Sequence, residues 1–517
     1  MLGRIASYSA QRADRVLAGI AVLAIGCGIL VGVGEDEMTL GGSGVRVAPL
    51  EIRVSGAVPV RSGPFKVTLG TMRSSLRATP GVVAVRRGPV SGRGRTTTLV
   101  VRLSDDAGQA QEAVEEIEAN LDAGLLRISF AGGGADLREA RSQTIDDLPL
   151  LLLATPLVAL LAIVALGARG ALATLFAAAA SVLGAGALCV GASLLIDVSV
   201  LALVGAAAAG VPCAVLLCGL ARSGAPPRGL AAAALASAAA FGTLAALGVG
   251  YLAAVAAGGA LASLLSAPLA VAAISAASSL WGLPAGGGRP LQRAFDRLAG
   301  VGGRSRIAAA AVALAALAAL AALSIPAIRL DPAALGAPTP PSIELWRGLV
   351  AAGAGIAIVA AIAAATSRRP LAALTSALAA AGAGSAAAGL TVLVFQDGNL
   401  SQLLDFDRGP VSVGALAAAV VAVAAASASQ GVATLGDDRT MGRAAAAGAL
   451  ASLVAALLAA TLLASSLVFA KTFGFVVAVG LLLDLLLVRG ILGAALTRTE
   501  TPTGATPARV GDHADPG

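Results

Sequence analysis

Two ionisable residues stand inside one apolar stretch of the sequence, where a charge needs either a function or a partner. Asp484 lies near the middle of the stretch 472–495, and Arg489 follows five positions later. A carboxylate in a bilayer costs roughly 2.5–3.5 kcal/mol. Its function would be ion coupling, in which the carboxylate binds and releases a proton. The structural alternative is a polar partner inside a helix bundle, for which the candidates are Ser427, Ser429, Gln430, Thr461 and Arg489. The spacing of five predicts poor geometry for the pair with Arg489, because partners on one face of an α-helix stand three or four residues apart.

The other reactive side chains offer little chemistry. All four cysteines, Cys27, Cys189, Cys213 and Cys218, lie in apolar stretches and are predicted to be buried free thiols. The single histidine, His513, stands in the polar C-terminal tail, so a zinc site and histidine acid–base catalysis have no candidate. The sequence contains no recognisable nucleophile–base pair and no paired carboxylates. We therefore expect no enzyme activity, no metal and no cofactor.

The composition indicates which elements must position these residues. The chain has 517 residues, of which 57% are hydrophobic and 13% charged, and its mean hydropathy is +0.88. A soluble protein carries about a quarter charged residues. The apolar runs exceed the roughly 20 residues that cross a bilayer as a helix, and backbone in hydrocarbon must satisfy its own hydrogen bonds. The sequence therefore predicts a polytopic α-helical membrane protein.

The net charge of +7 does not indicate nucleic-acid binding. The arginines gather in short loops between apolar runs, which is the positive-inside pattern, and aromatic residues make up only 3% of the chain. Arg4, Arg12 and Arg15 precede the first run and predict a cytoplasmic N-terminus. Lys471 opens the last run at its outer end, and its ammonium group is expected to extend to the membrane interface.

We expect about twelve transmembrane helices in two repeats of one plus five. The halves align at ARGALATLFAAAASVLGAG (168–186) and SRRPLAALTSALAAAGAGS (367–385), and internal repeats are common in transporters. The predicted parts are the N-terminus with the first helix (1–34), an external domain (35–146), a five-helix bundle (147–282), a cytoplasmic amphipathic linker (283–306), a seventh helix with a short external linker (307–345), a second five-helix bundle (346–496) and a disordered cytoplasmic tail (497–517).

The external segment 35–146 is polar and patterned like a small α+β domain. Alternating, β-branched stretches predict strands at 45–54, 82–87, 96–103 and 125–130, and periodic stretches predict helices at 68–78 and 107–123. The order β-α-β-β-α-β is typical of a ferredoxin-like domain. Since it follows a cytoplasmic N-terminus and one span, we expect it outside the cytoplasm.

This layout resembles the resistance-nodulation-division (RND) superfamily, and most of all its MMPL branch. The run GFVVAVGLLLDLLLVRGIL (474–492), which holds Asp484 and Arg489, is similar to the last span of that family, and LVFQDGNLSQLLDF (393–406) resembles the loop after the ninth span. The resemblance implies proton-driven export of lipids or other hydrophobic compounds. The bias of two lysines against 34 arginines favours a bacterial source.

The chain departs from this family where the family takes up protons. An Asp-Tyr pair ends a Gly-rich run in the family's fourth and tenth spans. Pro212 and Cys213 stand at the matching place in the fourth span, and Ser429 and Gln430 stand there in the tenth. Neither pair can change its charge in a useful pH range. A Pro-rich linker also replaces the family's second external domain.

Two functions remain open from the sequence. One is an MMPL/RND-like transport protein that exports lipid or hydrophobic compounds. The other is a non-transporting accessory or scaffold subunit that kept the fold and lost proton coupling. Either way we expect a multi-pass protein of the bacterial plasma membrane with both termini cytoplasmic. Its expected partners are membrane lipids and other membrane subunits, in a homo- or hetero-oligomer.

Overall fold

A computed structural model describes the chain from residue 1 to residue 493 with internal gaps. The gaps are 35–37, 39–48, 92–94, 105–106, 122–123, 125, 132–142, 144–146, 148, 197, 248–249, 284–304, 325–329, 332–340, 367–369, 405–410, 435–440 and 466–467. The predicted linker 283–306 lies mostly outside the described residues, and the predicted tail 497–517 lies wholly outside them.

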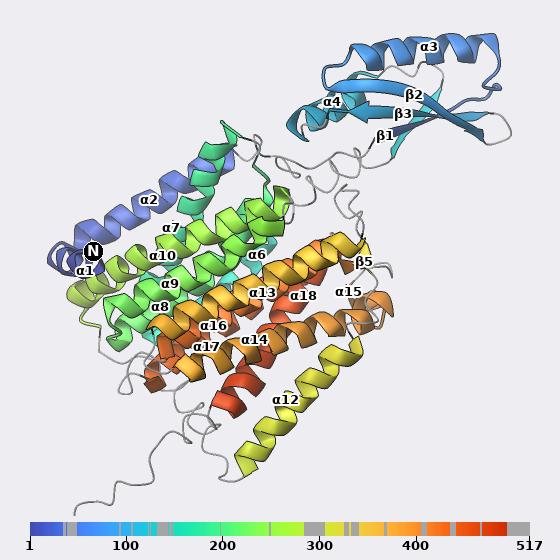
Figure 1. Cartoon of the computed structure of the whole chain (residues 1–517). Helices are drawn as coiled ribbons and strands as arrows, with labels where there is room; N and C mark the ends of the chain where they lie inside the picture. The colour runs from blue at the N-terminus through green and yellow to red at the C-terminus, as the bar shows by residue number, and fades with distance from the viewer. Residues whose placement is uncertain are drawn as a thin grey trace, which may run out of the picture.

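The first polar segment folds as a four-stranded sheet covered by two helices on one face (Figure 1). Its elements are β1 (Leu50–Ser55), α3 (Gly63–Ala78), β2 (Val82–Ser91), β3 (Thr96–Leu103), α4 (Ala107–Asn120) and β4 (Arg127–Ala131). The strand order is β2-β3-β1-β4, and all neighbouring strands are antiparallel. This element order and this sheet confirm the ferredoxin-like prediction.

The core of this domain explains where its elements begin. Ile52, Leu99 and Val101 point from the sheet to Phe65 and Met72 of α3, and all five are buried. The helix α3 begins five residues earlier than the sequence suggested, because Pro64 fits the first helical turn and Phe65 joins the core.

The first half of the membrane region surrounds a long helix that reverses its direction. The elements are α1 (Leu2–Gln11), α2 (Ala13–Gly34), α6 (Leu150–Leu153), α7 (Thr155–Ser193), α8 (Leu201–Ser223), α9 (Pro227–Gly242), the 3-10 helix η2 (Thr243–Leu247) and α10 (Gly250–Trp281). Gly167 interrupts α7 with φ of 73°, a conformation that favours glycine. The two legs of α7 correspond to the second and third expected spans.

The second half repeats this plan. Its elements are α12 (Ser305–Ser324), β5 (Leu330–Asp331), α13 (Pro341–Thr366), α14 (Pro370–Thr391), the π-helix η4 (Val392–Gln396), α15 (Ser401–Leu404), β6 (Val411–Ser412), α16 (Val413–Thr434), α17 (Met441–Thr461), the 3-10 helix η5 (Leu462–Ala464), α18 (Val468–Leu483) and the π-helix η6 (Asp484–Gly493). In this half α12 packs on α14, as α2 packs on α7 in the first half.

The helices account for the expected number of spans. Within the described residues, seven helices are long and apolar enough to cross a membrane, and four shorter apolar helices accompany them. One of the seven is the 44-residue helix Leu150–Ser193, which contributes two legs because of the reversal at Gly167. Val22, Ile25 and Ile29 of α2 are more than 60% exposed, as expected of side chains that face lipid. The chain is therefore a polytopic α-helical membrane protein with one small α+β domain.

The arginines of the first half meet at the end of the bundle opposite the α+β domain. Arg169 donates a hydrogen bond of 2.8 Å to the carbonyl oxygen of Trp281, and Arg222 donates to that of Leu166. Ser279 in turn donates to the carbonyl oxygen of Ala10 in α1. This clustering agrees with the positive-inside pattern, and the cytoplasmic location of this end stays a prediction.

Candidate functional site

Asp484 and Arg489 form a buried ion pair at the start of the last π-helical segment. Nε of Arg489 lies 2.7 Å from Oδ2 of Asp484, and their side chains are 17% and 1% exposed. A π-helix bonds residues i and i+5, so side chains five positions apart stand on one face of η6. The expectation of poor geometry was wrong, because it assumed α-helical spacing.

The guanidinium group of Arg489 also ties the last helix to the tenth span. It donates a second hydrogen bond, of 2.8 Å, to the carbonyl oxygen of Ser427 in α16. Thr461 does not join this site, since its hydroxyl donates to the carbonyl oxygen of Leu458 in its own helix. Ser429 and Gln430 belong to α16, but their side chains lie outside the described residues.

The pair neutralises the one deeply buried carboxylate found in the described part of the chain. Asp484 is the only Asp or Glu among the described residues that is classed as buried. Breaking a buried pair leaves an uncompensated charge, which is strongly unfavourable. The geometry therefore supports a structural link between two helices, and proton binding at Asp484 would require that this link be disrupted.

The fourth-span positions that match the family's relay hold no ionisable cluster. Pro212 and Cys213 are buried in α8, which continues as one helix through the proline. The thiol of Cys213 is directed at α10, where its sulfur lies 3.8 Å from the carbonyl oxygen of Ser263. The hydroxyls of Ser263 and Ser237 are 2.9 Å apart. This polar cluster joins α8, α9 and α10 within the first half through neutral groups.

The two halves meet around a small apolar cavity. Its volume is about 30 Å³, close to that of one water molecule. All of its lining residues are apolar: Leu151, Val204, Ala208, Ala422, Ala426, Ala455, Leu458, Ala459, Leu462, Phe473, Val477 and Leu481. A cavity without polar partners stays dry. The lining of this cavity therefore offers no group that could carry a proton.

A larger polar pocket opens in the second half beside α15 and the start of α18. It encloses about 440 Å³ and is lined by Asp147, Leu403, Leu404, Leu463, Ala464, Ser465 and Lys471. Lys471 is only 4% exposed, and its ammonium group donates to the carbonyl oxygen of Leu404. A backbone acceptor of α15 thus holds this ammonium group inside the protein, and the prediction that it extends to the membrane interface stays a prediction.

Asp147 and Ser465 are members of this pocket that the sequence reasoning missed. The hydroxyl of Ser465 donates to the carboxylate of Asp147, which links the entry of the first bundle to the loop before α18. The only sequence signal was the pair of carboxylates Asp146 and Asp147 directly before the apolar run that begins at 148. Charges at the end of a span are ordinary, so they gave no reason to pair Asp147 with a residue 318 positions away.

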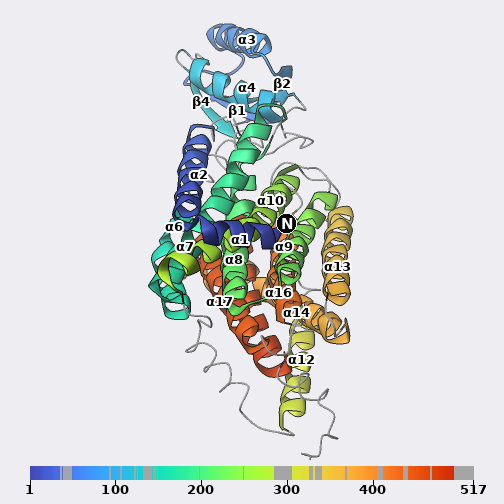
Figure 2. The ribbon, with the colours of Figure 1, turned by 90° about the vertical axis from the view of Figure 1, so that its left-hand side faces the viewer.

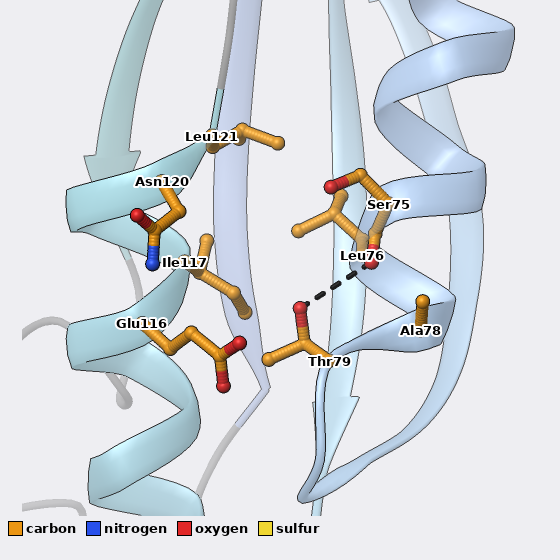
Figure 3. A pocket seen from close by; sticks show the side chains of 8 residues that line it. All are labelled: Ser75, Leu76, Ala78, Thr79, Glu116, Ile117, Asn120 and Leu121. Atoms are coloured by element: carbon orange, nitrogen blue, oxygen red, sulfur yellow. Dashed lines mark hydrogen bonds between the residues drawn. The ribbon is translucent and has the colours of Figure 1, made fainter.

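The α+β domain carries a shallow pocket between its two helices (Figure 3). It holds about 150 Å³ and is lined by Ser75, Leu76, Ala78, Thr79, Glu116, Ile117, Asn120 and Leu121. The hydroxyl of Thr79 donates to the carbonyl oxygen of Ser75, so it closes the end of α3. The lining residues offer a single carboxylate and no base beside it, which gives no basis for catalysis.

Comparison with known proteins connects this fold to membrane proteins of established structure. No family model and no curated protein matches the sequence. The crystal structure of SecDF, a translocon-associated membrane protein from Thermus thermophilus, matches with a TM-score of 0.55 at 12% identity, over 94% of this chain and 99% of that chain.

Two further solved structures match less well. SecDF in its super-membrane-facing form has a TM-score of 0.48 at 12% identity, over 95% of this chain and 98% of that one. A heavy metal efflux pump has a TM-score of 0.39 at 13% identity, over 57% of this chain and 40% of that one. The match to the first SecDF structure shows that the chain shares the fold of that protein along nearly its whole length. The MMPL branch stays a prediction.

Proposed function

We propose that this chain is a transport-related membrane protein of RND type that lacks a proton relay of its own. In this proposal it serves as an accessory or scaffold subunit of an export system in the bacterial plasma membrane, with both termini cytoplasmic. The observation that carries the proposal is the chemistry at the relay positions. Pro212 and Cys213 replace an ionisable pair in the fourth span, and the cavity between the halves is apolar.

The neutral Asp484–Arg489 pair supports the same reading. It holds the last helix against α16 through the carbonyl oxygen of Ser427. A subunit without a relay needs a partner that supplies energy, so we propose assembly with other membrane subunits in addition to membrane lipids. SecDF, which shares the fold, is described as translocon-associated. We propose no catalytic activity for this chain, since no nucleophile stands beside a base among the residues that the structure describes.

A proton-driven exporter of lipid or other hydrophobic compounds is the second candidate. It is favoured by Asp484, because an intramembrane carboxylate is a functional hypothesis in itself. It is also favoured by the similarity of 474–492 to the last span of the MMPL branch. In this candidate the ion pair would open during transport and Asp484 would carry the proton.

Cargo movement distinguishes the two candidates. The purified chain is reconstituted into liposomes that contain a fluorescent phospholipid, and its movement is followed with and without an imposed pH gradient. The accessory role predicts no more movement than in protein-free liposomes. The exporter role predicts movement that depends on the gradient, is lost in Asp484→Asn and persists in the control Thr461→Val, whose hydroxyl bonds only its own helix.

A further inference from the structure

The open face of the sheet in the α+β domain is strongly basic. Residues that alternate with the buried ones along each strand point away from α3 and α4. Every strand places one exposed arginine on that face: Arg53 on β1, Arg86 on β2, Arg102 on β3 and Arg127 on β4. Glu51 is the only carboxylate that the strand registers place among them.

The strand registers show that the arginines are spread over the face. Arg127 lies beside Ser55, Arg53 lies between Thr98 and Ser129, and Arg86 lies opposite Val100. Arg102 lies opposite Ala84 in a fourth row. Each arginine therefore stands in its own row of the sheet. The guanidinium groups cover the face instead of pairing, and none of the four has an ion-pair partner among the described residues.

The remaining side chains of this face suit phosphate. Hydroxyl groups stand beside the arginines, from Ser55, Thr96, Thr98 and Ser129. A guanidinium group binds phosphate through two parallel hydrogen bonds, and hydroxyls donate to the remaining oxygens. The opposite side of the domain has mixed charge, since α3 exposes Lys66 and Arg77 while α4 exposes Glu112, Glu115 and Glu116. Positive charge in excess is therefore concentrated on the open sheet face, which suits anions best.

The placement of the domain selects the partner. In both views α3 lies on the side of the sheet away from the helical bundle, so the open face is turned toward the bundle (Figures 1 and 2). The chain returns from this domain into the membrane at both ends, through 35–49 to α2 and through 132–149 to α6. Because both ends of the domain continue into helices that can cross a membrane, the bilayer lies within reach of the domain, and a basic surface near a bilayer is attracted to its anionic lipids.

We infer that the open face of the sheet, through Arg53, Arg86, Arg102 and Arg127, docks on the phosphate headgroups of anionic lipids in the adjacent leaflet. The inference is independent of whether the chain itself transports cargo.

The test measures how close the sheet face lies to the bilayer in the full chain. A cysteine introduced by Ser129→Cys, in a Cys27→Ser background, carries a fluorophore, and the protein is placed in nanodiscs whose headgroups carry a quencher. The discs contain either phosphatidylcholine alone or an equal mixture with phosphatidylglycerol. We expect stronger quenching in the anionic discs, and we expect added salt to remove the difference. A fluorophore at Ser74→Cys on α3 reports the far side and should not respond.

Charge variants assign the effect to this face. Arg53→Thr with Arg86→Thr should lower the ratio of docked to undocked domain at least about tenfold in anionic discs. Threonine suits an exposed strand position, so the sheet is retained. The matched control Lys66→Gln with Arg77→Gln removes the same charge from exposed positions of α3 and should leave quenching unchanged.

Two outcomes would overturn the inference. One is equal quenching of the Ser129→Cys label in both kinds of disc. The other is quenching of the Ser129→Cys label that does not change with phosphatidylglycerol but decreases when polyglutamate is added. That result would assign the face to an acidic protein partner.

Discussion

At the scale of single residues, the chemistry of this protein depends on the helix type around Asp484. The sequence places Arg489 five positions on, and a π-helix brings residues at this spacing to one face. The structure has that segment at Asp484–Gly493, and the pair forms with a distance of 2.7 Å. Apolar residues such as Leu485 and Leu486 do not indicate whether a helix is of the α or the π type. The sequence could therefore suggest Arg489 as one possible partner of Asp484, but it could not predict that the ion pair forms.

Removing one partner of this pair should be far more costly than removing both. Asp484→Leu leaves the Arg489 charge unpaired, and Arg489→Met leaves the carboxylate unpaired, so each should lower the free energy of unfolding by about 3–5 kcal/mol. The double variant should recover most of that loss. Thermal unfolding in detergent, read by a thiol-reactive dye that reports exposure of Cys213 and Cys218, measures all three variants. Additive losses in the double variant would contradict a pair that mainly compensates its own charges.

At the scale of elements, two glycines allow α8 and α10 to cross closely. A Cβ atom at Gly258 would overlap the carbonyl oxygen of Ala202, and one at Gly205 would overlap that of Val255. Small residues permit such contacts between membrane helices. With 64 glycines in the chain, the sequence could not indicate which ones lie at a crossing. The structure assigns this function to Gly205 and Gly258.

Gly258→Ala should therefore destabilise the first half by about 1–3 kcal/mol, as overpacking does. The matched control is Gly191→Ala in α7, where an added Cβ meets no atom within 4 Å. That control should be neutral or slightly stabilising, because alanine favours a helix more than glycine does. The thermal unfolding midpoints of Gly258→Ala and Gly191→Ala are compared in detergent. Equal midpoints for the two variants would argue against the close crossing of α8 and α10.

The reversal in α7 depends on one backbone conformation. Gly167 has φ of 73° and ψ of 162°, a region that is essentially restricted to glycine. An added Cβ there would meet no atom within 4 Å, so any cost is conformational. Gly167→Ala should lower the free energy of unfolding by about 1–3 kcal/mol, measured by the same melting experiment. An unchanged midpoint would mean that the legs are held by packing alone.

At the scale of the whole molecule, hydropathy and periodicity predicted the architecture well. The apolar runs located the seven long and four shorter apolar helices of the described residues, and the alternation in 96–103 predicted β3 with its observed bounds. Both signals are local, since they depend on burial along one segment. The fold of the polar segment followed from the order of its elements.

Contacts between distant segments could not be predicted in the same way. Asp147 meets Ser465, and Lys471 is covered by α15 at Leu404. Each contact depends on how the halves pack, which apolar spans do not specify. The basic sheet face likewise required the strand registers, because Arg53 and Arg102 are separated in sequence and share a face only in the folded sheet.

The most direct test of a missing proton relay is proton movement itself. The purified chain is reconstituted into liposomes that contain a pH-sensitive dye, a pH gradient is imposed, and a hydrophobic compound is added as cargo. We predict that the time course of the internal pH coincides with that of protein-free liposomes and that Asp484→Asn does not change it. Sustained proton movement that the cargo stimulates and Asp484→Asn abolishes would contradict the absence of a relay.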